Sequence, residues 1–249
     1  MIDDERETEK PEVKTWYCIE MPVTDYREVW QLQTDLVQAR KLKQIANDLI
    51  LLVEHPPVFT LGRSGGKDSL KVTEAFLEST GARMVQVERG GSVTYHGPGQ
   101  IVGYPIIDLH RFRIKVVDYV SALEEVMIRT SAKWGIAAGR NSMNRGIWVD
   151  DNKLGSVGVA VRRGVCFHGF ALNVNIALEP FSWIHPCGLE GIGVTSFEKV
   201  LHHPVSIRPV RDAVKRYVQD VFKIKLIPKT VEQIAETLKT HNDNAALNV

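Results

Sequence analysis

The chain has 249 residues, and its 31 Lys plus Arg against 30 Asp plus Glu give a formal net charge of +1. Hydrophobic residues make up 44% and charged residues 24%, which is typical of a folded globular protein and excludes a disordered chain. A balanced charge provides no general attraction for nucleic acid, and no apolar run approaches the ~18 residues that a membrane span needs.

The terminal segments and the cysteine content indicate the compartment in which the protein is expected to act. The first twelve residues are acidic and lack an apolar segment, so they do not resemble a signal or transit peptide. Residues 1–13 and 242–249 are expected to be flexible tails. The 3 cysteines cannot all pair and show no C-x-x-C spacing, which argues against a disulfide framework and a zinc ribbon. We therefore predict a cytoplasmic protein.

Between these tails, the apolar pattern predicts strands and helices that do not alternate strictly. Strands are expected at residues 14–20, 48–54, 82–87, 101–107, 146–149, 153–161 and 165–174. Helices are expected from Asp25 to about residue 39, at 73–80 and 118–134, from Pro209 to about 222, and after a cap at Thr230 and Gln233. This order predicts one α/β domain, residues 14–241, around a mixed or largely antiparallel sheet rather than a doubly wound fold.

A glycine-rich segment at residues 89–100 is the first candidate site. Its glycines let backbone approach a ligand closely, its bare N–H groups suit an oxyanion, and Arg89 and His96 add polar side chains. The alternative is a tight turn between two strands, and composition alone does not decide between them. The candidate residues are Arg89, Gly90, Gly91, Ser92, Val93, Thr94, Tyr95 and His96.

The second candidate segment begins at Lys153. Small residues follow it, and a strand with small residues lies close to a ligand. Otherwise Lys153 is a solvated turn lysine and His168 a satisfied strand histidine. The candidate residues here are Lys153, Ser156, Val157, Gly158, His168, Gly169 and Phe170.

Cys187 is the third candidate. A proline before it and a glycine after it predict an exposed loop, whereas Cys18 and Cys166 lie in apolar strands and are expected to be buried. An exposed thiol serves as a nucleophile if a neighbour lowers its pKa from ~8.5. The candidate activators by chemistry are Lys153, His168 and His185.

Two other motifs are not expected to bind ligands. Residues 62–68 look like a phosphate loop, but the glycine spacing is wrong and Asp68 replaces the Ser or Thr that would bind Mg²⁺. The adjacent His202 and His203 diverge on a strand and do not form a metal pair.

Taken together, the three candidate segments resemble the octanoyltransferases of lipoate biosynthesis. The resemblance runs from about Tyr17 to Phe222. It is carried by the segment 89–100, by Lys153, by His168-Gly169 and by Pro186-Cys187-Gly188. It implies a single α/β domain with a mixed central sheet plus a smaller sheet, similar to the catalytic domains of biotin and lipoate protein ligases.

The resemblance also implies a reaction. Such an enzyme transfers an octanoyl group from octanoyl-acyl carrier protein to the target lysine of apo lipoyl domains. The transfer passes through a cysteine thioester. The acceptor domains belong to 2-oxoacid dehydrogenases and to the glycine cleavage H protein. Cys187 corresponds to the nucleophile and Lys153 to its activating partner, and the other candidates above correspond to the acyl-binding walls. The resemblance implies no metal, cofactor, nucleic acid or membrane.

Two alternatives remain open at this point. An ATP-dependent lipoate or biotin protein ligase of the same fold forms an acyl adenylate and does not need a thiol at Cys187. A non-enzymatic, carrier-binding relic of the fold needs neither Lys153 nor Cys187. ATP dependence and the Pro-Cys-Gly setting of Cys187 discriminate between these alternatives.

Overall fold

The computed structural model describes residues 14–142, 144–185 and 193–246. Its strands are β1 (Thr15–Val23), β2 (Asp48–Glu54), β3 (Val58–Leu61), β4 (Arg83–Gln86), β5 (Val93–His96), β6 (Gln100–Asp108), β7 (Ile147–Val149), β8 (Asn152–Arg162), β9 (Val165–Asn173), β10 (Gly193–Val194) and β11 (Lys225–Pro228). Its α-helices are α1 (Tyr26–Lys41), α2 (Glu74–Ser79), α3 (Leu109–Phe112), α4 (Val116–Ala132), α5 (Phe197–Leu201), α6 (Ile207–Phe222) and α7 (Val231–Ala246). Two short 3₁₀ helices are η1 (Lys67–Ser69) and η2 (Glu179–Trp183).

The strands form two sheets. The large sheet has the order β10-β8-β9-β6-β2-β1-β11, with β7 beside β8, and the small sheet has the order β4-β3-β5. In the large sheet β1 pairs in parallel with β2 and β11, whereas β6 pairs antiparallel with β2 and β9. The prediction of a single α/β domain with a mixed central sheet and a smaller sheet is confirmed.

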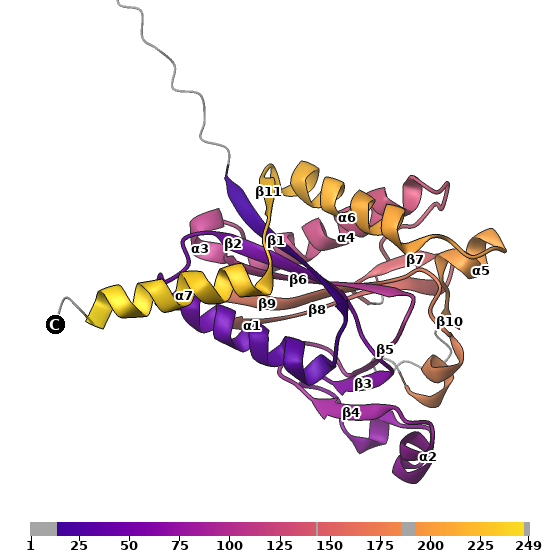
Figure 1. Cartoon of the computed structure of the whole chain (residues 1–249). Coiled ribbons are helices and arrows are strands. Elements are labelled where there is room, and N and C mark those ends of the chain that lie inside the picture. The colour runs from indigo at the N-terminus through magenta and orange to yellow at the C-terminus, as the bar shows by residue number, and fades with distance from the viewer. Residues whose placement is uncertain (1–13, 143, 186–192, 247–249) are drawn as a thin grey trace, which may run out of the picture.

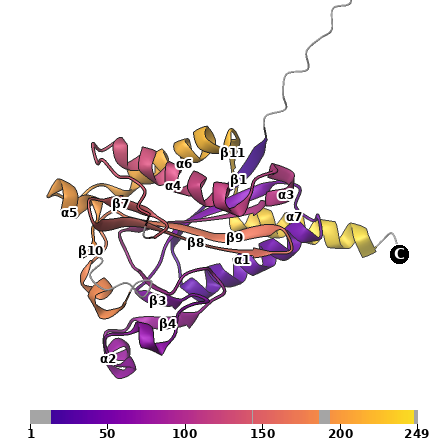
Figure 2. The ribbon, with the colours of Figure 1, turned by 180° about the vertical axis from the view of Figure 1, so that it is seen from behind.

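Helices cover both faces of the large sheet (Figures 1 and 2). Helices α4 and α6 lie on one face, and α1 and α7 lie on the other, the side that also carries the small sheet. The apolar run in β2 follows from this arrangement, because Ile50 and Leu52 enter the α4–α6 core while Leu49 and Leu51 enter the α1 core. The small sheet has a separate core with α2 and η2.

Several elements differ from the sequence prediction. The short strands β3, β5, β10 and β11 and the short helices α3 and α5 were not predicted, and β5 lies inside the segment expected to be a loop. The predicted C-terminal tail at 242–249 begins inside α7, because that helix continues to Ala246. Residues 1–13 and 247–249 lie outside the described part of the chain, and the domain boundaries stay a prediction.

Candidate active site

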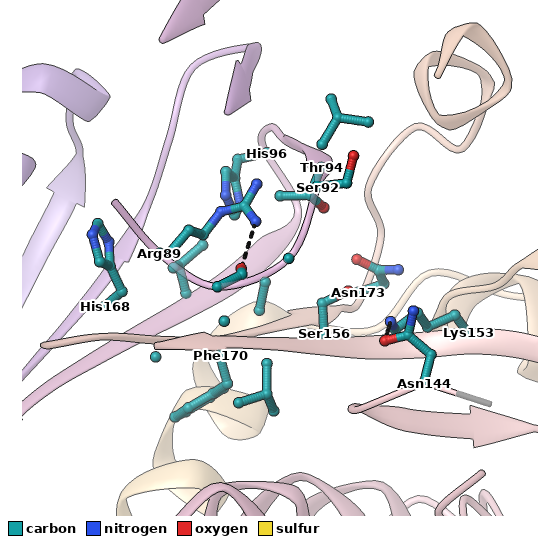
Figure 3. A pocket seen from close by; sticks show the side chains of 18 of the residues that line it. Arg89, Ser92, Thr94, His96, Asn144, Lys153, Ser156, His168, Phe170 and Asn173 are labelled. Carbon is teal, nitrogen blue, oxygen red and sulfur yellow. Dashed lines mark hydrogen bonds between the residues drawn. The ribbon is translucent and has the colours of Figure 1, made fainter. Parts of the chain in front are cut away.

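A pocket lies between the two sheets, on the α1 side of the large sheet. Strands β8 and β9 form its floor, the segment 89–92 and β5 form its roof, and Tyr26 of α1 closes part of it. In Figure 3, Lys153 and Asn144 lie at one end, and Arg89 and His168 lie toward the other.

The pocket brings together most of the residues predicted from the sequence. Those that line it are Arg89, Gly90, Gly91, Ser92, Val93, Thr94, His96, Lys153, Ser156, Val157, Gly158, His168, Gly169 and Phe170. Tyr95 is absent from the lining, because its ring packs in the small-sheet core, 5.0 Å from the Phe59 ring and 5.4 Å from the Phe181 ring between centroids. Cys187, with its flanking Pro186 and Gly188, lies outside the described residues.

Phe170 contributes to the pocket differently from its expected role. Its ring lies on the other side of the strand from the labelled pocket side chains (Figure 3) and belongs to the α4–α6 core. There it packs over Gly103, where an added Cβ would come within 2.4 Å of the ring. The ring therefore supports the pocket floor from behind.

Small side chains keep the pocket floor open. Two of the cross-strand pairs between β8 and β9 consist of small residues, Ser156 with Ala171 and Gly158 with Gly169. A Cβ added at Gly158 would come within 3.2 Å of both the Arg89 Cδ and the Gly90 carbonyl oxygen of the roof. The spacing between floor and roof at this point thus depends on a glycine.

The roof is held by a buried arginine. The Arg89 Nη2 donates to the Thr60 carbonyl at 2.6 Å, and its Nη1 donates to the Gly90 carbonyl at 3.1 Å. The Gly90 N–H donates to the Val159 carbonyl of β8 at 2.9 Å. Arg89 therefore fixes the segment to the small sheet, and Gly90 fixes it to the large sheet.

The segment that resembled a phosphate loop supports this roof. The N–H groups of Gly62 and Arg63 donate to the carbonyls of Ser92 and Arg89, at 2.7 and 2.9 Å. A Cβ at Gly62 would lie 2.3 Å from the Gly91 carbonyl oxygen. The glycine that made the segment look like a nucleotide-binding loop is required here for close backbone packing.

A β-bulge places Lys153 over the pocket. Trp148 of β7 pairs with Lys153 and Ile147 pairs with Gly155, so Leu154 is an extra residue in β8. In a regular strand, residues three apart face opposite sides of the sheet, whereas the bulge turns both Lys153 and Ser156 toward the pocket. The Lys153 Nζ lies 3.2 Å from the Asn144 Oδ1 and 5.2 Å from the centre of the Trp148 ring.

His168 reaches the pocket through a left-handed backbone conformation. Its φ is 55°, which is uncommon for a non-glycine residue. The conformation places its ring on the α1 side, 6.4 Å from the Tyr104 ring between centroids and with Nε2 3.7 Å from the Glu88 Oε2. The buried Gln33 of α1 supports it by accepting the His168 N–H at 2.9 Å. Strained backbone of this kind is typical of functional sites.

The histidines beside the pocket are neutral at physiological pH. Burial, and then the nearby His55, lowers the pKa of His96 to about 3, and burial lowers the pKa of His55 to about 4. The His96 Nδ1 hydrogen bonds to the Gln100 Oε1 at 2.7 Å, and the Gln100 Nε2 donates to the Asn173 Oδ1 at 2.8 Å. The His55 Nε2 lies 2.9 Å from the Tyr104 hydroxyl. These contacts form an uncharged network suited to an uncharged ligand.

Glu88 lies near the His168 end and carries a charge. The contact with His168 is the main cause that lowers the pKa of Glu88 to about 2, with smaller contributions from its own backbone N–H and the Trp30 indole, although partial burial opposes this shift. The Arg162 Nη2 donates to the Glu88 Oε1 at 2.8 Å. Burial lowers the pKa of His168, so this histidine is neutral beside an ionised carboxylate.

Comparison with known proteins identifies the family of this chain. The family model of the lipoyl protein ligase A/B catalytic domain matches residues 25–219. An octanoyltransferase from Desulfotalea psychrophila is 42% identical over 208 residues, which cover 83% of this chain and 93% of that protein. The chain belongs to the octanoyltransferase family. Another octanoyltransferase, from Alkaliphilus metalliredigens, is 44% identical over 209 residues, 84% of this chain and 95% of that protein.

Solved structures confirm the fold expected for this octanoyltransferase family member. Lipoate-protein ligase A bound with ATP has a TM-score of 0.70 at 17% identity and covers 93% of this chain and 94% of its own. A bipartite lipoate protein ligase from Thermoplasma acidophilum has a TM-score of 0.71 at 16% identity, with 92% of each chain covered. At such low identity the likeness shows the fold alone.

Sequence reasoning missed several pocket residues of this family member. Asn144 lies in a polar turn before β7, and its polar character alone does not distinguish it from a solvated turn residue. Other missed residues become neighbours only through sheet pairing. The missed lining residues are Tyr26, Val102, Tyr104, Asn144, Ala171, Asn173, Phe181 and Val194.

Two further findings concern metals and membranes. Within residues 14–142, 144–185 and 193–246, no group of three His, Cys, Asp or Glu side chains is arranged to hold a metal ion. Across that same part of the chain, no helix has the length and apolar character to cross a bilayer.

Proposed function

We propose that the protein transfers an octanoyl group from octanoyl-acyl carrier protein to the target lysine of an apo lipoyl domain, through a thioester on Cys187. Membership of the octanoyltransferase family is the observation that carries the proposal. The small-residue floor and the apolar side chains of Val93, Val102 and Phe181 in the pocket lining support it, because both suit an unbranched alkyl chain. Burying about seven carbons beyond the carbonyl supplies roughly 5 kcal/mol of gross stabilisation at ~0.8 kcal/mol per methylene.

The proposed reaction has two steps. In the first, the Cys187 thiolate attacks the carbonyl carbon of the octanoyl thioester, and the carrier thiol leaves and takes a proton. In the second, the lysine amine of the lipoyl domain attacks the new thioester, an amide forms, and the Cys187 thiolate is released. One thioester replaces another in the first step, so that step needs no ATP, and a thiolate serves as both nucleophile and leaving group.

The other two cysteines are poorly suited to this role. Burial raises the pKa of Cys18 to about 12, and burial likewise raises the pKa of Cys166 to about 12. Both thiols are protonated at neutral pH, and both are buried in strands of the large sheet. The assignment of Cys187 itself depends on its Pro-Cys-Gly motif and on the family resemblance.

We assign Lys153 the role of partner to Cys187. Its Nζ lies at one end of the pocket, where Asn144 and Trp148 contact it. As a cation, Lys153 favours the thiolate in the first step. As a neutral amine, it takes the proton from the incoming lysine in the second step.

The acceptors follow from the same proposal. They are the lipoyl domains of 2-oxoacid dehydrogenases and the glycine cleavage H protein, which present a lysine to be modified. The proposed nucleophile must remain a free thiol, which agrees with the cytoplasmic location expected from the sequence. Neither step uses a metal, a cofactor, nucleic acid or a membrane.

Intact-protein mass spectrometry tests the proposal. After incubation with octanoyl-acyl carrier protein and no ATP, we expect one octanoyl adduct on the wild-type protein and none on Cys187→Ser. Adding an apo lipoyl domain should move the octanoyl group to that domain. An adduct on Cys18 or Cys166 would contradict the assignment, and transfer that requires ATP and free octanoate would favour the ligase alternative.

A further inference from the structure

A buried carboxylate on α4 contacts the chain segment that carries Asn144. Glu124 is only 1% exposed. Its Oε1 accepts the Gly146 N–H at 2.9 Å, and its Oε2 accepts the Arg140 Nε at 3.2 Å and lies 3.5 Å from the Arg145 Nη1. All three partners belong to the connection between α4 and β7. A single carboxylate therefore contacts both the middle of this connection and its β7 end.

The same connection shapes the surroundings of Lys153. Asn144 accepts from the Lys153 Nζ at 3.2 Å. Gly146 has a φ of 123°, and a Cβ there would lie 2.9 Å from the Lys153 Cε and 2.2 Å from the Gly155 carbonyl oxygen. The Lys153 side chain thus passes directly against the Gly146 backbone, and its amine meets the Asn144 side chain.

Glu124 is an unusual residue for its position. Packing α4 against the sheet requires only apolar side chains at buried positions, as at its neighbours Leu123 and Met127. A buried carboxylate is costly unless ion pairs and hydrogen bonds compensate for its lost hydration. The compensation here comes from the segment that contacts Lys153, which suggests that the carboxylate orders that segment.

We propose that Glu124 is a positioning residue, which fixes the α4–β7 connection and thereby holds the Lys153 amine at the end of the pocket. The inference rests on the proposed function, in which Lys153 takes part in acyl transfer. Glu124 acts through Gly146 and Asn144 and does not itself touch the substrate.

Three substitutions and one control separate this role from general stabilisation. Glu124→Leu removes the acceptor for the Gly146 N–H, whereas Glu124→Gln retains an oxygen at the same reach. Glu124→Asp keeps the charge but shortens the reach, and it replaces the leucine variant if that variant does not fold. Glu125→Leu is the control, because Glu125 is more exposed and pairs with Arg140 at 2.9 Å and Arg129 at 2.8 Å.

Steady-state octanoyl transfer is the first measurement. We expect Glu124→Leu to lower kcat by about tenfold or more, because small displacements of a catalytic group cost up to ~100-fold. The KM for octanoyl-acyl carrier protein should stay within about twofold, since the acyl-binding walls are unchanged. Glu124→Gln should recover most of kcat, and Glu125→Leu should match the wild type. An unchanged kcat in the leucine variant, a failure of glutamine to recover it, or an equal loss in Glu125→Leu would overturn the proposal.

Chemical labelling of Lys153 is the second measurement and needs no octanoyl transfer. An amine-acetylating reagent is applied to the folded proteins, and Lys153 is quantified by peptide mass spectrometry against Lys223 as an internal standard. We expect Glu124→Leu to raise the relative labelling of Lys153 by about threefold or more, because the amine loses a fixed position. Unchanged labelling would contradict the positioning role. Absence of octanoyl transfer in the wild type would instead contradict the proposed function, and the labelling would still decide the role of Glu124.

Discussion

Lys153 and His168 face the pocket because the backbone departs from regular strand geometry at both places. The bulge at Leu154 turns Lys153 toward the pocket, and a φ of 55° turns His168 toward the same face. Irregular backbone costs free energy, so it persists where surrounding contacts hold it. Gln33 provides one such contact at His168, and Glu124 provides another through Gly146.

The proposed pairing of Lys153 with Cys187 predicts a pH-dependent change in thiol reactivity. Lys153→Ala should slow the alkylation of Cys187 by iodoacetamide at about pH 7 much more than at about pH 9, where the thiol ionises without help. Alkylation of Cys187 is followed by peptide mass spectrometry. Lys223→Ala, which changes a lysine at the C-terminus of α6, is the control and should leave both rates unchanged. Equal slowing at both pH values would contradict the assignment.

Gly146 gives a prediction about stability. An alanine there must adopt a φ of 123° and place a Cβ 2.2 Å from the Gly155 carbonyl oxygen. We expect Gly146→Ala to lower the free energy of unfolding by about 2 kcal/mol or more, from backbone strain and this clash. Urea denaturation measures the change. Gly139→Ala in the same connection is the matched control, since no atom lies within 4 Å of its added Cβ. Equal effects at both glycines would contradict the packing described here.

At the scale of elements, the β8–β9 hairpin determines the depth of the pocket. Gly158→Ala adds a methyl group between floor and roof, within 3.2 Å of Arg89 and Gly90. We expect the kcat/KM ratio for octanoyl over butanoyl thioesters to fall about tenfold, because one methylene in a binding pocket is worth ~1–3 kcal/mol. Transfer assays with both acyl donors measure the ratio. Val161→Ala, at an exposed position on the same strand, should leave the ratio unchanged. A fall in both rates by the same factor would show a loss of fold or chemistry instead of selectivity.

Regular elements could be predicted from sequence periodicity, and short irregular ones could not. The buried run of β2, the buried face of α4 and the β8–β9 hairpin all follow from the spacing of apolar residues. Strand β5 was predicted as loop because glycines flank its four residues, and it becomes a strand only by pairing with β3. Such pairing depends on contacts far apart in the chain, which a local pattern does not contain.

The residues of the candidate site divide in the same way, into those that local motifs predict and those that only tertiary contacts identify. The motifs identified nearly all of the roof and floor residues, and strand alternation explains why Thr94 and His96 face the pocket while Tyr95 does not. Glu124 gave no signal in the sequence, because an acidic residue in a helix normally faces solvent. Asn144 likewise resembled an ordinary turn residue. Their importance comes from tertiary contacts with Gly146 and Lys153.

At the scale of the whole molecule, the pocket depends on two sheets with separate cores. The Thr60 carbonyl of the small sheet accepts from Arg89, and the Val159 carbonyl of the large sheet accepts from Gly90. Two neighbouring residues of one loop therefore connect both sheets across the pocket. Destabilisation of either sheet should displace this loop and thereby disturb the pocket, so stability and activity are coupled here.

The buried neutral histidines predict how stability changes with pH across the molecule. In the folded protein the pKa values of His55 and His96 are about 4 and about 3, below the ~6.5 of an unfolded chain. Below about pH 6.5 the unfolded state therefore binds more protons than the folded state, and stability falls as the pH falls. Above about pH 6.5 both states are neutral at these positions, and the contribution is constant. From about pH 7.5 to about pH 5.5 each histidine should remove about 1.4 kcal/mol.

Urea denaturation of the wild type and of His55→Asn at these two pH values tests this linkage. The wild type should lose about 2.7 kcal/mol or more between them, and the variant should lose about 1.4 kcal/mol less, because one titrating group is gone. Groups common to both proteins cancel in this comparison, and Glu88, with a pKa of about 2, titrates below this range. His203→Asn, at an exposed position, is the control and should behave as the wild type. An equal loss in wild type and His55→Asn would mean that His55 is protonated as easily in the folded protein as in the unfolded chain. The interpretation of the contacts beside the pocket as an uncharged network would then be wrong.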